Sequence, residues 1–337
     1  MSPATPAADP NTGGGEFGLI RRHFQRPATT QPTAVALGIG DDCALLRPAP
    51  GYQLAVSSDM LVAGRHFFAD VAPQTLGHKA LAVNLSDLAA MGARPLGFTL
   101  ALALPELDDP WLAAFAQGLF ALADAHACPL VGGDTTRGPL NICITVLGEV
   151  LPGQALRRDA AQAGDDLYLS GQVGEARLAL ECLRGTPWAT EHCGPEALAR
   201  LRERLERPTP RLALGQALAG VARAAIDVSD GLASDLGHIL QASRLGAELA
   251  PDEWALAPEL RALPEPQRLE CLLNGGDDYE LLFTAPMAAR SAVAGAAAAS
   301  GTPVQRIGRL TPEPGLRLRE PSGRLRPWTA SGWDHFA

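Results

Sequence analysis

The sequence predicts a mixed α/β or α+β protein with two lobes of comparable size. Segments with the two-residue apolar alternation of strands are interleaved with segments of helical spacing in both halves of the chain. A length of 337 residues suits one or two domains. Pro152 and Gly153 open a polar stretch between the halves, so we place domains at 16–151 and 152–337.

The first half begins with a helix in which Phe17, Ile20 and Phe24 share one side. A later helix is closed by Gly92 and then Pro95, which is a typical stop signal. The elements expected here are helices at Glu16–Phe24, His78–Met91 and Trp111–His126, and strands at Ala34–Ile39, Gln53–Ser57, Phe98–Leu104, Leu130–Val131 and Asn141–Val150.

The second half restarts the same alternation, and its charged stretch at 184–207 is assigned no element. The strands expected are Asp166–Ser170, Ala224–Val228, Glu280–Thr284 and Pro303–Gly308. The helices expected are Gly174–Leu183, Arg211–Val221, Leu232–Ser243 and Ala288–Ala299.

Composition excludes several classes of protein. The net charge of −9 and the single lysine, Lys79, argue against nucleic-acid binding. Six scattered cysteines form no C-x-x-C pair, which is typical of reduced thiols in a cytoplasmic protein. Residues 1–15 lack the basic start and apolar core of a signal peptide, so a disordered tail is expected there. No apolar run is long enough to span a membrane.

The positions of the aspartates are the most informative feature. Most of them follow strand-like segments and stand beside glycine or serine, where a ligand can approach the backbone closely. Taken alone, any one of these aspartates could instead form a turn or cap a helix, and this explanation suits Asp41, Asp108 and Asp109. That explanation fits Asp87 poorly, because Asp87 lies in an apolar helix and shares a face with Asn84.

These ligand types predict phosphate chemistry with magnesium. Carboxylate and hydroxyl oxygens suit Mg²⁺ rather than zinc, and bound Mg²⁺ usually bridges to substrate phosphates. The sequence lacks a P-loop, the protein-kinase motifs and EF-hand spacing, and Gly38–Cys43 lacks the third glycine of a dinucleotide fingerprint. A kinase of this sequence would hold ATP by metals, backbone N–H groups and arginine.

Taken in order, eight motifs resemble those of the thiamine-monophosphate kinase family, over nearly the whole chain. They are Gly15–Ile20, Gly38–Ala44, Ser57–Phe67, Lys79–Ala93, Gly132–Gly138, Ile226–Leu232, Gly275–Leu281 and Gly332–Phe336. The resemblance implies the two-domain fold shared with aminoimidazole ribonucleotide synthetase. It also implies a homodimer whose N-terminal domains pair through a β-barrel-like interface.

The resemblance further implies the residues that bind ATP, several Mg²⁺ ions and thiamine monophosphate. The residues matching the metal ligands are Asp42, Ser57, Ser58, Asp59, Asp87, Asp134, Asp227 and Asp230. Those matching ATP contacts are Gly133, Arg158 and Ser229, and those matching substrate contacts are His66, Asp277 and Trp333. The family commonly has glutamate where this chain has Asp277. Other interpretations remain open for three residues. His66 could be a packed histidine, Trp333 could cap a hydrophobic core, and Arg157 rather than Arg158 could contact ATP.

The expected reaction is direct in-line transfer from ATP to thiamine monophosphate, without a general base or a phosphoenzyme. The acceptor phosphate has a second pKa of about 6, so it is mostly deprotonated at neutral pH. The difficulty is charge repulsion, about 4 kcal/mol for two charges 4 Å apart at an effective dielectric of 20, which several Mg²⁺ ions would offset. Two alternatives are a selenophosphate or aminoimidazole ribonucleotide synthetase-like enzyme, and a non-catalytic metal-binding scaffold.

Overall fold

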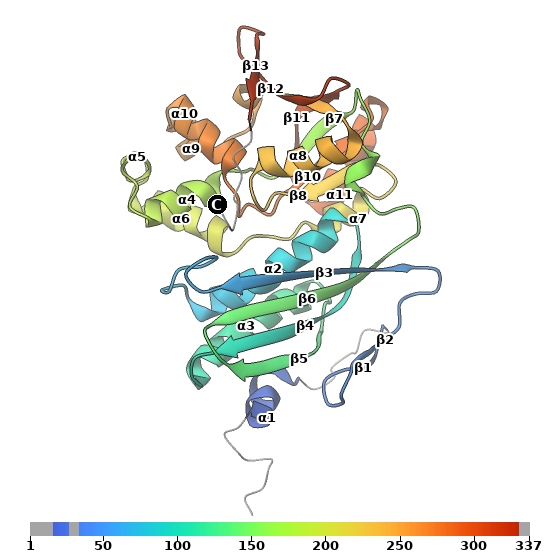
Figure 1. Cartoon of the computed structure of the whole chain (residues 1–337), viewed down its shortest axis with the longest axis vertical. Helices are drawn as coiled ribbons and strands as arrows, with labels where there is room; N and C mark the ends of the chain where they lie inside the picture. The colour runs from blue at the N-terminus through green and yellow to red at the C-terminus, as the bar shows by residue number, and fades with distance from the viewer. Residues whose placement is uncertain (1–15, 27–33, 330–337) are drawn as a thin grey trace, which may run out of the picture. The chain divides into compact units, whose positions relative to one another are not determined.

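The computed structural model describes residues 16–26 and 34–329 (Figure 1). The expected tail at 1–15 and the predicted substrate contact Trp333 lie outside these residues. The chain divides into two compact units, which we describe separately. The first is Met1–Ala49, Ser58–Leu81 and Leu96–Leu147, and the second is Pro50–Ser57, Ala82–Pro95 and Gly148–Ala337. The domain boundary at 151/152 stays a prediction.

The first unit contains most of a four-stranded sheet of order β3-β6-β4-β5. Its helices pack closely where they carry glycine: a Cβ on Gly77 of α2 would lie 2.0 Å from the carbonyl oxygen of Phe115 in α3. Asp108 caps α3 by accepting the N–H of Trp111, as its turn position predicts. The elements that lie wholly or partly in this unit are α1 (Glu16–Leu19), η1 (Ile20–Phe24), β1 (Val35–Leu37), β2 (Leu45–Leu46), β3 (Gln53–Val62), α2 (Pro73–Ala90), β4 (Arg94–Leu104), α3 (Asp109–Ala125), β5 (Leu130–Arg137) and β6 (Asn141–Val150).

The second unit is built on a mixed sheet of order β13-β12-β9-β11-β7-β10-β8. Its strands are β7 (Asp166–Ser170), β8 (Ala224–Asp227), β9 (Gly246–Leu249), β10 (Leu281–Ala285), β11 (Val304–Thr311), β12 (Gly315–Arg319) and β13 (Leu325–Trp328). Its helices are η2 (Arg158–Ala160), α4 (Glu175–Leu183), α5 (Pro187–Thr190), α6 (Pro195–Glu206), α7 (Leu212–Ala217), α8 (Leu232–Ser243), η3 (Pro251–Glu253), α9 (Pro258–Ala262), α10 (Glu265–Leu269), η4 (Glu270–Asn274), η5 (Met287–Ala289) and α11 (Arg290–Ser300).

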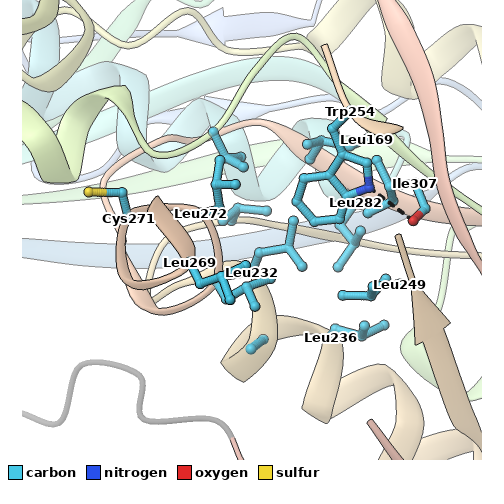
Figure 2. Packing of buried hydrophobic residues seen from close by; sticks show 14 of the residues in the cluster. Leu169, Leu232, Leu236, Leu249, Trp254, Leu269, Cys271, Leu272, Leu282 and Ile307 are labelled. Atoms are coloured by element: carbon cyan, nitrogen blue, oxygen red, sulfur yellow. Dashed lines mark hydrogen bonds between the residues drawn. The ribbon is translucent and has the colours of Figure 1, made fainter. Parts of the chain in front are cut away.

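The core of the second unit is aliphatic. Figure 2 shows Leu232 and Leu236 of α8 among buried leucines from neighbouring strands, including Leu249 of β9 and Leu282 of β10. The indole of Trp254 donates a hydrogen bond of 3.1 Å to the carbonyl oxygen of Ile307, so its polar atom is satisfied inside this core. This packing anchors the strand ends and helix starts that carry the predicted site residues.

Two expectations about strand ends are wrong. Asp59 and Asp134 lie inside β3 and β5, although the glycines and serines beside them were expected to end those strands. β5 continues through its two glycines because it pairs in parallel with β4 from Leu130 to Arg137. At Gly133 a Cβ would lie 1.9 Å from the carbonyl oxygen of Leu100, so glycine here permits close strand contact.

Helix α6 lies in the charged stretch to which no element was assigned. Charged residues surround the apolar stripe formed by Leu201 and Leu205, and this hides the helical pattern in the sequence. Ion pairs one turn apart, such as Arg202 with Glu206, support it. Within the part of the chain that the structure describes, no helix is long and apolar enough to cross a lipid bilayer.

Candidate active site

Two loops of the second unit are joined along their backbones. One is the turn 227–231, between β8 and α8, and the other is the loop 275–280, which leads into β10. The N–H of Asp277 donates to the carbonyl oxygen of Ser229 at 2.9 Å, and the N–H of Tyr279 donates to Val228 at 2.8 Å. Val228 in turn donates to Glu280 at 2.8 Å. These two hydrogen-bonded loops therefore carry residues predicted to contact the metal, ATP and the acceptor.

The loop 275–280 has a strained backbone. Asp277 and Tyr279 have φ values of 65° and 50°, in the left-handed region that non-glycine residues rarely adopt. Gly276 approaches the turn so closely that a Cβ there would lie 2.2 Å from the carbonyl oxygen of Ser229. Strain of this kind persists only where surrounding contacts over-determine the conformation, and it clusters at functional sites.

A buried ion-pair network holds the C-terminal end of this loop. Glu280, only 1% exposed, accepts hydrogen bonds from Arg204 at 2.7 Å and from Arg211 at 2.6 and 2.7 Å. The hydroxyl of Ser170 donates to the same carboxylate at 2.5 Å. The neighbouring Asp278 is buried and accepts the N–H of Gly174, and burial raises its pKa well above the usual value.

Asp235, in the first turn of α8, contacts the turn 227–231 and was not singled out by sequence reasoning. One of its carboxylate oxygens accepts the backbone N–H groups of Ser229, Asp230 and Gly231, each at 3.1 Å. Burial, followed by the charges of Asp227 and Asp230, raises its pKa to about 8. The signal available in the sequence was an acidic residue four positions after the glycine of the turn, at a position that helical spacing directs into the core.

Three further predicted site residues meet around α2. The hydroxyl of Ser57 donates to the carboxylate of Asp87 at 2.5 Å. Burial raises the pKa of Asp87, while the Ser57 hydrogen bond and the positive charge of Arg158 lower it, and burial is the larger effect. Arg157 instead forms an exposed pair with Asp159 at 2.6 Å. Arg158 is therefore the arginine whose charge acts at this site.

The first unit carries the other predicted metal ligands. Asp42 is exposed, and its N–H donates to the side chain of Asp41 at 2.8 Å. Asp59 is half-buried in β3, and Asp134 is exposed in β5. Ser58 points to the face of β3 opposite its neighbours Ser57 and Asp59, and its hydroxyl bonds Thr145 at 2.9 Å.

His66 lies in the turn after β3. Its Nδ1 accepts the N–H of Val62 at 2.9 Å, so the neutral ring carries its proton on Nε2. The side chain is half-buried, whereas the adjacent Phe67 is buried. The predicted substrate contact thus has a fixed ring orientation.

No group of three or more His, Cys, Asp or Glu side chains in the described ranges is gathered closely enough to hold a metal ion by itself. Magnesium commonly takes one or two carboxylates and completes its shell with water and substrate phosphates. The predicted ligands are distributed over both units, with Asp42, Ser58, Asp59 and Asp134 in the first and Ser57, Asp87, Asp227 and Asp230 in the second.

Comparisons with known proteins give a consistent assignment. Residues 40–150 match the family model of the AIR synthase related protein N-terminal domain, and residues 162–320 match that of the C-terminal domain. A thiamine-monophosphate kinase of Salmonella typhimurium is 45% identical over 326 residues, which cover 96% of this chain and 98% of that protein.

Two solved structures extend the likeness to the fold. The crystal structure of thiamine-monophosphate kinase from Stenotrophomonas maltophilia is 48% identical, with a TM-score of 0.79, and the match covers 85% of this chain and 91% of the other. AaThiL complexed with AMPPCP and TMP is 29% identical, with a TM-score of 0.73, over 95% of this chain and 96% of the other. The chain has the two-domain AIR synthase-like fold and belongs to the thiamine-monophosphate kinase family.

Proposed function

We propose that this chain transfers the γ-phosphoryl group of ATP to the phosphate of thiamine monophosphate, giving thiamine diphosphate. The observation that carries the proposal is the backbone pairing of the turn 227–231 with the loop 275–280. Transfer between two bound anions needs both to be held in line, and a hydrogen-bonded pair of loops supplies that alignment. The relative that binds an ATP analogue and TMP matches this chain over nearly its whole length.

ATP is held by Gly133, Arg158 and Ser229 in this proposal. Arg158 is supported over Arg157 by its electrostatic effect on Asp87, since Arg157 is already paired with Asp159. Gly133, with φ of 145°, lies in backbone that a side chain would not permit. Ser229 presents its carbonyl oxygen to Asp277 and its N–H to Asp235, so its hydroxyl is positioned by a fixed backbone.

Magnesium fits the donor set that the chain offers. The eight predicted ligands supply carboxylate and hydroxyl oxygens and no sulfur or nitrogen, which is the chemistry of a hard cation. The negative charges of Asp227 and Asp230 help to raise the pKa of Asp235, and a bound cation would offset them. When bound, the ions offset the repulsion between the two substrates.

Thiamine monophosphate is held by His66, Asp277 and Trp333 in this proposal. The acceptor oxygen needs no general base, because its second pKa of about 6 leaves it ionised at neutral pH. Transfer is direct, and no residue of the chain becomes phosphorylated. The six free cysteines support a reducing, cytoplasmic setting.

The exposed apolar residues on one face of β3 support a homodimer. Leu54, Val56 and Met60 alternate along this strand and are 54%, 59% and 52% exposed. An exposed apolar strand face is a frequent site of association, and it suits pairing with a second copy of the sheet.

The test is a coupled assay of ADP release with ATP and thiamine monophosphate, with unphosphorylated thiamine as the control. Turnover is expected with the monophosphate only and requires Mg²⁺. Turnover with thiamine, or none with the monophosphate, contradicts the proposal. Incubation with labelled ATP alone is expected to leave the protein unlabelled, and a stable phosphoprotein contradicts direct transfer.

A further inference from the structure

The turn 227–231 carries two predicted metal ligands and one predicted ATP contact. The N-cap residue of the helix that follows, α8, makes no side-chain hydrogen bond. Gly231 occupies the N-cap of α8 and has no side chain to satisfy the free backbone amides. Its φ of 124° is a conformation that other residues rarely adopt, and a Cβ there would lie 2.9 Å from the carbonyl group of Asn274. The turn must therefore be fixed by a group outside itself.

Asp235 supplies that group. It is 2% exposed, and one oxygen receives all three amides of Ser229, Asp230 and Gly231 at 3.1 Å. All three amides belong to residues that precede Leu232, the first residue of α8, and two of them precede the N-cap Gly231, so Asp235 does more than cap α8. A buried amide without a partner is unfavourable, and three converging on one atom define the path of the backbone.

The geometry points to Asp235 as a positioning residue for the nucleotide and metal side of the site. We infer that its carboxylate holds the backbone of 229–231, so that Asp227, Ser229 and Asp230 keep the directions that the proposed reaction needs. This inference rests on the proposed function for the roles of those three residues. The loop 275–280 is held separately, by the Glu280 network and by Asp278, so loss of Asp235 acts first on ATP.

Three substitutions separate the position of the acceptor oxygen from the presence of an acid group. Asp235→Asn keeps an acceptor oxygen at the same distance from the backbone and removes the titratable proton. Asp235→Glu keeps the carboxyl group and displaces its oxygens by one methylene. Asp235→Ala removes the acceptor. The control is Leu236→Ala, because Leu236 is the next residue of α8, is fully buried in the core (Figure 2) and has an aliphatic side chain that cannot hydrogen-bond an amide.

The first measurement is hydrogen exchange of the amides at 229–231 in the full-length, metal-free protein, below the unfolding range of every variant. Exchange is expected to rise about tenfold or more in the Ala and Glu variants and to stay within about twofold of wild type in the Asn variant and in the control. Equal exchange in the Glu and Asn variants overturns the inference, even if the Ala variant does not fold.

The second measurement is the pair of KM values for MgATP and thiamine monophosphate. The Glu variant is expected to raise KM for MgATP about tenfold or more, with the other KM within about threefold of wild type. Equal increases in the KM for MgATP and the KM for thiamine monophosphate overturn the inference. The exchange measurement needs no substrate, and wild-type turnover tests the proposed function independently. The inference about Asp235 and the proposed function can therefore fail separately.

Discussion

The N–H of Asp277 donates to the carbonyl oxygen of Ser229 at 2.9 Å, and this bond ties the proposed acceptor loop to the proposed nucleotide turn. The two residues are 48 positions apart in the sequence, and the antiparallel pairing of β10 with β8 brings them together. Gly276 lies beside this contact, and one of the substitutions below is directed at it.

Replacing Asp87 or Asp230 by Asn should lower kcat about 100-fold or more while the protein stays folded, because each is a proposed cation ligand. The measurement is turnover over a range of Mg²⁺ concentrations, with circular dichroism to check the fold. Asp109→Asn is the matched control, since Asp109 is exposed and pairs with Arg22 on the surface. Wild-type turnover of either variant at low Mg²⁺ would show that the ligand assignment is wrong.

Gly276→Ala should displace the loop 275–280 and reduce kcat/KM for thiamine monophosphate about tenfold or more, because the new Cβ would lie 2.2 Å from the carbonyl oxygen of Ser229. Gly295→Ala in α11 is the control. The Cβ there meets no atom within 4 Å, so the change should raise stability by about 1 kcal/mol and leave turnover unchanged. Equal kinetics for the two variants would contradict the close approach.

Glu280→Gln should lower the free energy of unfolding by about 3–5 kcal/mol, because it leaves the guanidinium groups of Arg204 and Arg211 without their buried counter-charge. Chemical denaturation measures this. Glu265→Gln removes an exposed pair with Arg326 and should change stability by less than about 0.5 kcal/mol. Similar losses in both variants would mean that the network contributes no more than a surface pair.

The contribution of Asp235 to stability should fall as the pH rises from about 4 to about 8. In this range the unfolded chain has lost the Asp235 proton, whose unfolded pKa is near 3.8, whereas the folded protein, with a pKa of about 8, retains it. Burial of Asp278 acts in the same direction. The measurement is the thermal midpoint with chelator present, and Asp235→Asn should show a shallower decline. Parallel curves for variant and wild type would exclude this contribution.

Val56→Arg should convert a wild-type dimer to a monomer, because it places a charge in the centre of the exposed apolar face of β3. Light scattering coupled to size-exclusion chromatography gives the mass. Leu107→Arg is the control, since Leu107 is 61% exposed and belongs to the loop before α3, not to β3. A monomeric wild type, or a dimeric Val56→Arg variant, would refute the proposed interface.

The sequence alone determined the fold class, most elements of both halves and the family. Regular apolar periodicity identifies such elements as α3 and β6, and ordered motifs identify the family, because both depend only on residues near one another in the chain. Strand β12, which pairs with β9, and the continuation of β3 and β5 past Asp59 and Asp134, beside β6 and β4, depend on partners distant in sequence.

Only the tertiary structure decided which predicted residues meet. The contact of Ser57 with Asp87, the opposite orientation of Ser58, the pairing of Arg157 with Asp159 and the amide hydrogen bonds of Asp235 follow from packing around these side chains. A side chain's direction and partners are set by the elements that surround it, and one-dimensional spacing carries no record of them.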